Sequence, residues 1–345
     1  MVKYYVCNVA RRNTMEIFME NVKDTIRENA NDTTIQEIEK YHADTEKIME
    51  YDTPAYAPRK RRFGDRCDGR RVRTLPSMSY LTPYLMDVRS DAQNHFEDVI
   101  DITNIENYLD TKHKEGYTNM TLLHVILAAY VRVISERPGL NRFISGQKVY
   151  SRNYIECVMT VKKEMTLESP DTCIKVIFDP RDDVYNVYKK FQKVYKESVE
   201  AESDFDNVAG TLKKLPGLLL RATVKLLHFL DYFGKLPKAL LKVSPFHGSM
   251  IITSMGSLGI PAIYHHLYNF GNLPCFVSYG SIFTGDAIKR DGTRERHHFV
   301  TFKVVTDERI CDGYYYASAF KRLKRYLLHP EILDMPATKV SEDID

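Results

Sequence analysis

The chain has 345 residues, 43% of them hydrophobic and 28% charged, a balance typical of one large soluble domain with an appendage or of two modest domains. Its 49 basic and 46 acidic residues leave a net charge of +3, which excludes an overall field strong enough to draw the chain to nucleic acid or to an anionic membrane. We therefore expect no nucleic-acid partner, and any basic binding site to be local.

The cysteines and the amino terminus bear on where the protein works. None of the 6 cysteines forms a C-x-x-C pair, and several lie in apolar, strand-like runs where a free thiol behaves as a small hydrophobe. The amino terminus lacks the pattern of a signal peptide, and no segment reaches about 18 uninterrupted apolar residues. We expect reduced cysteines in a cytoplasmic protein that is neither secreted nor membrane-spanning.

Residues 1–55 are predicted to form a helical amino-terminal extension. Ile17, Phe18 and Val22 follow helical spacing, and two short amphipathic helices are expected within residues 14–50. Residues 56–75 then break this pattern with prolines and the run Arg59–Arg62, which indicates a basic linker. The linker is interpreted as solvated or as paired with a neighbouring acidic surface; the alternative is a phosphate contact for a nucleotide cofactor.

Residues 76–335 carry globular signals. Thr103 and Glu106 have capping-box spacing, which predicts a helix that starts there and ends near Gly116. The stretch 121–134 is apolar on nearly every side and predicts a buried helix, in which His124 is a core histidine rather than a catalyst.

Alternating or apolar runs predict strands, and helical spacing predicts two further helices, one from Val184 to Tyr195 and one from Tyr316 to Leu327. A polar tail, residues 336–345, follows. The order of elements indicates a mixed α/β (mixed α+β) domain. The predicted strands are 155–161, 173–178, 250–253, 275–279 and 299–305.

Residues 212–243 are rich in Leu, Lys and Arg and are punctuated by Pro216, Gly234 and Pro237. Two interpretations stay open for this basic amphipathic pair of helices. One is a peripheral contact with a membrane surface. The other is a helical insertion that covers a substrate pocket or a subunit contact, which the short apolar runs and the small net charge favour.

Three ordered motifs resemble one family. Pro138, Leu140 and Asn141 resemble a P-x-LN segment, and Ile252–Gly256 resembles a T-I-S-N-L-G strand and turn. Asp307–Gly313, with the letters DERICDG, resembles the D-H-R-V-V-D-G signature. These are motifs of chloramphenicol acetyltransferase and of the catalytic domain of the 2-oxoacid dehydrogenase acyltransferases, with Glu308 in place of the signature histidine.

The resemblance covers roughly residues 76–335. It implies a chloramphenicol acetyltransferase-like mixed sheet with flanking helices, to which this chain adds its helical amino-terminal arm. It also implies a homotrimer, a site at the subunit boundary, coenzyme A as acyl carrier and a small-molecule acyl acceptor. No lipoyl-bearing module or subunit-binding segment is recognisable, so a stand-alone trimer is expected, without lipoyl attachment and without a metal.

Carried over by position, the resemblance assigns the base to Glu308, the structural carboxylate to Asp312 and the oxyanion hydroxyl to Thr253, or to Ser254 beside it. In the family the aspartate holds its loop through an arginine. A model glutamate has a pKa near 4.3 and a thiol near 8.5, so proton transfer between them costs roughly 6 kcal/mol, against about 3 kcal/mol for imidazole. The other interpretation is that Glu308 pairs with Arg309 or a linker arginine and holds the turn.

Two pairs of adjacent histidines offer substitute bases, and His266 is the candidate we retain. Adjacent side chains in a strand point to opposite faces, so one of each pair at most reaches a shared site, and their spacing is poor for a metal. Two functions stay open: a coenzyme A-dependent acyltransferase, or a non-catalytic binding or assembly module of the same fold. The two pairs are His265 with His266, and His297 with His298.

Overall fold

The computed structural model describes residues 60–162, 171–200, 208, 210, 212–289 and 291–345. The chain divides into two compact units, Met1–Ala55 and Tyr56–Asp345. The amphipathic helices expected within residues 14–50 lie outside the described residues.

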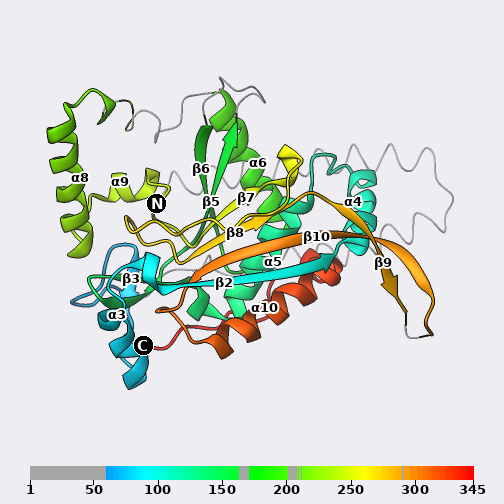
Figure 1. The fold of residues 1–345 in the computed structure, drawn as a ribbon, viewed down its shortest axis with the longest axis horizontal. Helices are drawn as coiled ribbons and strands as arrows, with labels where there is room; N and C mark the ends of the chain where they lie inside the picture. The colour runs from blue at the N-terminus through cyan, green and yellow to red at the C-terminus, as the bar shows by residue number, and fades with distance from the viewer. Residues whose placement is uncertain (1–59, 163–170, 201–207, 209, 211, 290) are drawn as a thin grey trace, which may run out of the picture. The chain divides into compact units, whose positions relative to one another are not determined.

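A mixed sheet runs through the second unit (Figure 1). In chain order its strands are β2 (Gln93–Asp101), β5 (Ile155–Lys162), β6 (Asp171–Phe178), β7 (Met250–Ser254), β8 (Cys275–Tyr279), β9 (Phe283–Ile288) and β10 (Arg294–Asp307). The spatial order is β2-β10-β8-β7-β5-β6, and β9 pairs with β10. Strands β5, β7 and β8 are parallel and the other pairs are antiparallel. The predicted mixed α+β class is confirmed.

All five predicted strands are present, but β2 was not predicted. It is an edge strand whose side chains are mostly exposed or half-buried, so it lacks the alternation of a strand that covers a core. Its pairing comes instead from β10, along the whole register from Phe299 opposite Asp101 to Asp307 opposite Gln93.

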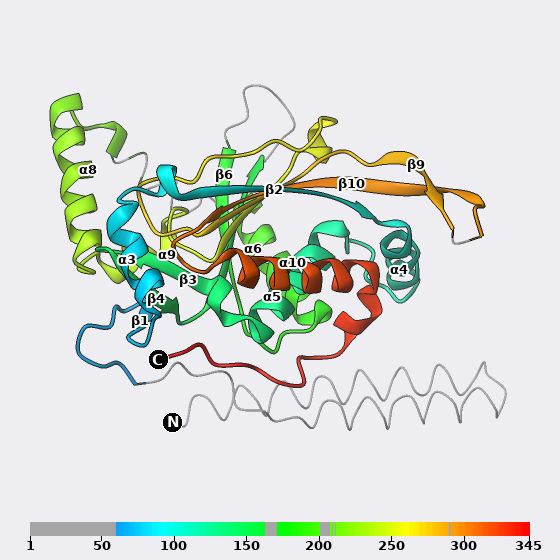
Figure 2. The ribbon, with the colours of Figure 1, turned by 60° about the horizontal axis from the view of Figure 1, so that its bottom comes forward.

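Helices cover one face of the sheet (Figure 2). They are α4 (Thr103–Lys114), α5 (Leu122–Glu136), α6 (Val184–Glu200) and α10 (Gly313–Leu328). Helix α5 contacts α4, α6, α10 and β5. It is buried from Leu123 to Ser135, which confirms the prediction of a buried helix. The core therefore lies between α5 and the sheet.

The predicted capping box at Thr103 and Glu106 is wrong. Ile102 occupies the cap position of α4, and no side chain caps it. The Thr103 hydroxyl instead accepts a hydrogen bond from the His298 backbone, and Glu106 pairs with the His298 ring. His298 lies on β10, far along the chain, so a tertiary contact replaces the hydrogen bonds that a local capping box would have formed. A capping box does occur at Thr121 and His124.

The basic segment expected as a linker contributes to the folded body. Strand β1 (Gly69–Arg71) pairs with β4 (Lys148–Arg152), which pairs with β3 (Arg142–Ser145) in a small second sheet. The acidic surface that its arginines meet is the end of the same chain: Arg62 pairs with Asp345, and Arg70 donates to the carbonyl oxygens of residues 343 and 344.

Further helices and short 3₁₀ turns occur in the described residues. They are α3 (Ser77–Leu85), α8 (Gly217–Tyr232), α9 (Lys238–Val243) and the short 3₁₀ turns η1 (Arg89–Ala92), η2 (Pro138–Asn141), η3 (Gly256–Leu258) and η4 (Pro330–Asp334). Figures 1 and 2 both show α8 at the periphery, away from the sheet. Among the described residues, no helix combines the length and apolar character needed to cross a membrane.

Candidate active site at the turn after β10

The turn that joins β10 to α10 is fixed by a buried cluster of one carboxylate and two arginines. The Asp307 carboxylate accepts hydrogen bonds from Arg309 Nε and Nη2, both at 2.8 Å, and from Arg89 Nε at 3.3 Å. All three side chains are buried. The hydroxyl of Tyr316, one turn into α10, donates to the Asp307 carbonyl at 2.8 Å. Burial lowers the pKa of Arg89, and the neighbouring Asp307 carboxylate opposes that effect.

The same arginines extend the cluster to two other segments. Arg309 Nη1 donates to the carbonyl oxygens of Met86 and Asp87, before η1. Arg89 donates to the carbonyl oxygens of Tyr268 and Gly271, in the segment between β7 and β8. Because hydrogen bonds from a charged donor are strong, the backbone of the turn has little freedom.

Glu308 is held at its backbone, and its carboxylate has no partner among the described residues. Its backbone N–H donates to Ala92 O at 2.8 Å, while its side chain is exposed. The carboxylate makes no hydrogen bond or ion pair with any residue that the structure describes. The interpretation in which it pairs with Arg309 finds no support, because Asp307 occupies that guanidinium.

Asp312 caps the following helix. Its carboxylate accepts the backbone N–H of Tyr315 at 2.8 Å and satisfies one of the donors at the start of α10. The side chain is exposed. Within the described residues, the arginine contact that the resemblance implies for Asp312 is made by Asp307.

Thr253 and Ser254 end strand β7, and their hydroxyl groups differ in availability. The Ser254 hydroxyl accepts the backbone N–H of Ser257 at 3.3 Å. The half-buried Thr253 hydroxyl has no hydrogen-bond partner in the described part of the chain. The turn beyond needs glycine at 256, since a Cβ there would lie 2.6 Å from Gly280 O.

One chain does not bring Thr253 and Glu308 together. Thr253 lies opposite Ser278, and Ser278 lies opposite Lys303 of β10. Glu308 is five residues beyond Lys303, which at about 3.3 Å per residue places it roughly 16 Å further along the strand direction. A site that contains both residues therefore needs two copies of the chain.

His266 is exposed, and its ring meets Tyr268 edge-on at 4.9 Å. Its segment reaches the arginine cluster through the Tyr268 carbonyl, but the ring itself has no contact with Glu308 among those the structure shows. Its neighbour His265 stacks on Phe276 at 4.4 Å, and burial lowers the pKa of the His265 ring. The other histidine pair is engaged elsewhere: His297 pairs with Asp101 and His298 with Glu106.

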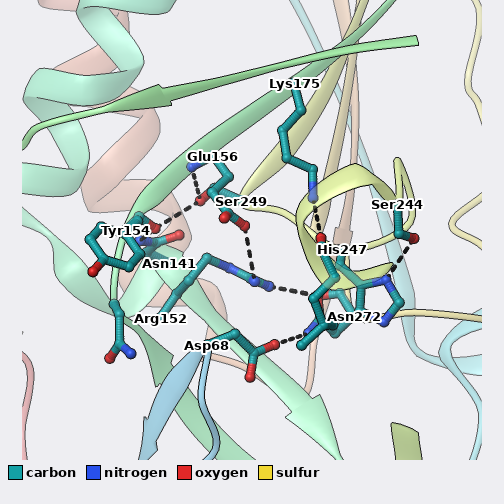
Figure 3. A network of polar contacts seen from close by, with 12 residues as sticks. Asp68, Asn141, Arg152, Tyr154, Glu156, Lys175, Ser244, His247, Ser249 and Asn272 are labelled. Atoms are coloured by element: carbon teal, nitrogen blue, oxygen red, sulfur yellow. Dashed lines mark hydrogen bonds and ion pairs between the residues drawn. The ribbon is translucent and has the colours of Figure 1, made fainter. Parts of the chain in front are cut away.

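Sequence patterns did not predict a second polar cluster, shown in Figure 3. The buried Arg152 donates to Asn272 Oδ1 at 2.8 Å, and Asn272 donates to Asp68 Oδ2 at 3.1 Å. Arg152 also lies over the Phe143 ring, and burial lowers the pKa of Arg152. The nearby His247 ring shares a hydrogen bond with the Ser244 hydroxyl at 2.8 Å. The residues of this second cluster are scattered along the chain from the linker to the segment before β8, so only folding brings them together.

Two cavities in the described part of the chain have volumes of about 60 and 30 Å³. The larger lies between the end of α5, the second sheet and the carboxy-terminal tail, and the smaller lies in the apolar core. Neither is lined by Glu308 or Thr253. No group of three or more His, Cys, Asp or Glu side chains in the described residues is arranged to hold a metal ion.

The sequence matches no protein-family model and no curated protein. The structure is similar to that of a probable dihydrolipoamide acetyltransferase from Listeria monocytogenes 4b F2365, with 14% identity and a TM-score of 0.47 over 74% of this chain and 94% of that chain. The cubic core of a pyruvate dehydrogenase multienzyme complex follows with 15% identity and a TM-score of 0.45, over 76% and 93%. A chloramphenicol acetyltransferase has 11% identity and a TM-score of 0.42, over 72% and 94%.

Two of these proteins, the probable dihydrolipoamide acetyltransferase and the chloramphenicol acetyltransferase, belong by name to the groups whose motifs the sequence resembles. The similarity concerns the backbone fold alone.

Proposed function

We propose that the chain is an acyltransferase whose site forms at the boundary between two copies, with Glu308 of one copy as the base. The observation that carries this proposal is the Glu308 carboxylate, which has no partner among the described residues and is exposed on a turn held by Asp307, Arg309 and Arg89. A carboxylate that served only to hold the turn would be paired. An exposed carboxylate on a firmly held backbone is available to a substrate.

In the proposed reaction, the acceptor's hydroxyl or thiol gives its proton to Glu308 and bonds to the acyl carbon of a thioester. The hydroxyl of Thr253 in the neighbouring copy donates a hydrogen bond to the carbonyl oxygen as that oxygen gains negative charge. The carbon–sulfur bond then breaks, and Glu308 returns its proton to the departing thiolate. A carboxylate becomes a stronger base when it is removed from water, so closure of the boundary favours this role.

Coenzyme A is the acyl carrier that the resemblance implies. Cavities of about 60 and 30 Å³ in one chain do not fit it, because small-molecule sites usually span roughly 300–1,000 Å³. We therefore assign no residue of a single chain to hold it.

Two substitutions of Glu308 test the proposal, with acyl-coenzyme A and a panel of hydroxyl and thiol acceptors. Glu308→Gln cannot accept the proton and should reduce transfer by roughly 10²- to 10⁴-fold. Glu308→His should retain or raise transfer, because imidazole is a base better matched to neutral pH. Glu197→Gln, which alters an exposed glutamate of α6 outside the proposed site, is the matched control and should change transfer little. Equal rates for Glu308→Gln and the native chain would overturn the proposal.

The second candidate is a binding or assembly module without catalysis. The observation that favours it is the apolar surface of α3, where Met78, Leu81 and Leu85 are all exposed. Calorimetry with coenzyme A separates the candidates. If the native chain, Glu308→His and Glu308→Gln all fail to bind it, the module is the better account.

A further inference from the structure

The outward face of α8 is apolar, and none of the described residues covers it. Leu218, Leu226, Phe229 and Phe233 are exposed by 85%, 56%, 60% and 58%, and with Ala222 they fall on one side of a helix with 3.6 residues per turn. The opposite side carries half-buried residues at helical spacing, namely Leu220, Thr223, Leu227 and Leu230. Helix α8 therefore has one apolar stripe toward the body and a second toward solvent.

Arg221 and Lys225 lie beside this outward stripe by helical spacing, and further basic residues lie in the segments before and after α8. Within residues 212–243 the acidic group is Asp231, which is buried. The basic residues are all exposed, and none forms an ion pair with a residue that the structure describes. Long Lys and Arg side chains beside an apolar stripe match a layer with anionic headgroups above an apolar interior. These residues are Lys213, Lys214, Arg221, Lys225, Lys235, Lys238 and Lys242.

The carboxyl end of α8 is anchored to the body. Arg66 Nη2 donates to Asp231 Oδ1 at 2.8 Å, and His247 Nε2 lies 3.3 Å from Asp231 Oδ2. Arg66 also donates to the Asp231 carbonyl and to the Ser145 hydroxyl, both at 2.6 Å. This buried cluster holds the carboxyl end of the helix against the body.

A second copy of this chain is a poor occupant of the stripe in a two-fold contact. Such a contact places the same surface of two copies face to face. The exposed cations of one α8–α9 segment would then oppose those of the other without an acidic partner from the same segment. An anionic surface removes this repulsion.

We propose that the outward face of α8 binds the surface of an anionic lipid bilayer. The apolar stripe enters the boundary between headgroups and acyl chains, and the lysines and arginines contact lipid phosphates. The proposal extends beyond acyl transfer and does not depend on it, since lipid binding needs neither donor nor acceptor.

Co-sedimentation of the full chain with vesicles tests the proposal. Phosphatidylcholine vesicles that contain phosphatidylglycerol should bind the chain, and vesicles of phosphatidylcholine alone should bind it much more weakly. Leu226→Ser with Phe229→Ser should weaken binding by more than about tenfold, because two large apolar side chains no longer enter the lipid. Arg221→Gln with Lys225→Gln should weaken it by about 25-fold at low salt, roughly fivefold for each charge.

Matched controls use the same chemistry at other exposed positions. Ile282→Ser with Ile288→Ser at the ends of β9, and Lys321→Gln on α10, should leave vesicle binding unchanged. Circular dichroism of every variant should match the native chain, since all these side chains are on the surface. Absent binding, equal binding to both kinds of vesicle, or equal losses in the control variants would overturn the proposal. Loss of self-association in the α8 variants without any lipid binding would assign the face to a second copy instead.

Discussion

The buried ring of His124 makes stability depend on pH. Burial lowers the pKa of this ring to about 4, against 6.5 for a free histidine. The backbone N–H of Thr121 donates to Nδ1 at 3.0 Å, an arrangement that only the unprotonated nitrogen permits. The core role predicted for His124 agrees with this geometry.

We predict that acid destabilises the fold through His124. The unfolded chain binds a proton near pH 6.5 and the folded chain only near pH 4, so the contribution is complete above 6.5 and is lost as the pH falls toward 4. This difference between the pKa values of His124 in the unfolded and folded chain corresponds to roughly 3 kcal/mol of folding stability. Urea denaturation at several pH values between these limits would measure the free energy of unfolding of the native chain and of His124→Asn. The difference between the two should fall by that amount as the pH is lowered. If the free energies of unfolding of the two chains changed with pH in parallel, this prediction would be contradicted. Burial also lowers the pKa of His247, but both chains contain His247, so its contribution cancels in the difference.

At the scale of elements, the carboxy-terminal tail belongs to the folded body. The Asp343 carboxylate pairs with Arg142 through two bonds, Oδ2 to Nε at 2.7 Å and Oδ1 to Nη2 at 2.5 Å. Burial alone would lower the pKa of Arg142, but the Asp343 carboxylate raises it. The Asp345 carboxylate, in contrast, pairs with Arg62 on the surface.

Two substitutions in the tail should therefore lower the free energy of unfolding by different amounts. Asp343→Asn leaves the buried Arg142 without its counter-charge and should lower the free energy of unfolding by about 3 kcal/mol. Asp345→Asn breaks a solvent-exposed pair and should cost less than about 1 kcal/mol. Urea denaturation at neutral pH measures both. If the two variants are equally stable, the tail does not contribute to the fold as its contacts indicate.

At the scale of the whole molecule, the proposed site requires assembly. Thr253 and Glu308 lie on strands of one sheet whose register keeps them apart, so they can meet only between copies. We predict a homotrimer, the assembly implied by the resemblance to chloramphenicol acetyltransferase. Light scattering at micromolar concentration should give three times the mass of one chain, which is 40.1 kDa. A monomer would leave Glu308 without an oxyanion donor from Thr253.

The sequence by itself determined the elements whose side chains show a simple period. The strands at 155–161, 173–178 and 275–279 alternate or are apolar throughout, and the buried helix α5 is apolar all round, because each of these contacts the core directly. The motif residues also indicated the fold, and they located the turn at Glu308. The local order of residues is enough to predict these elements and motifs, because each of them lies within one continuous segment of the chain.

Only the tertiary structure decided what the polar and edge residues do. Asp307 and Arg89 are separated by 218 residues, and Arg142 and Asp343 by 201, so no spacing could reveal either pair. Strand β2 forms because its backbone pairs with that of β10. Thr103 does not cap its helix as predicted, because its hydroxyl accepts a hydrogen bond from the His298 backbone instead. The periodicity of α8 showed apolar residues but not which side the body covers. Burial and partner choice depend on segments that are distant along the chain, and folding alone brings them together.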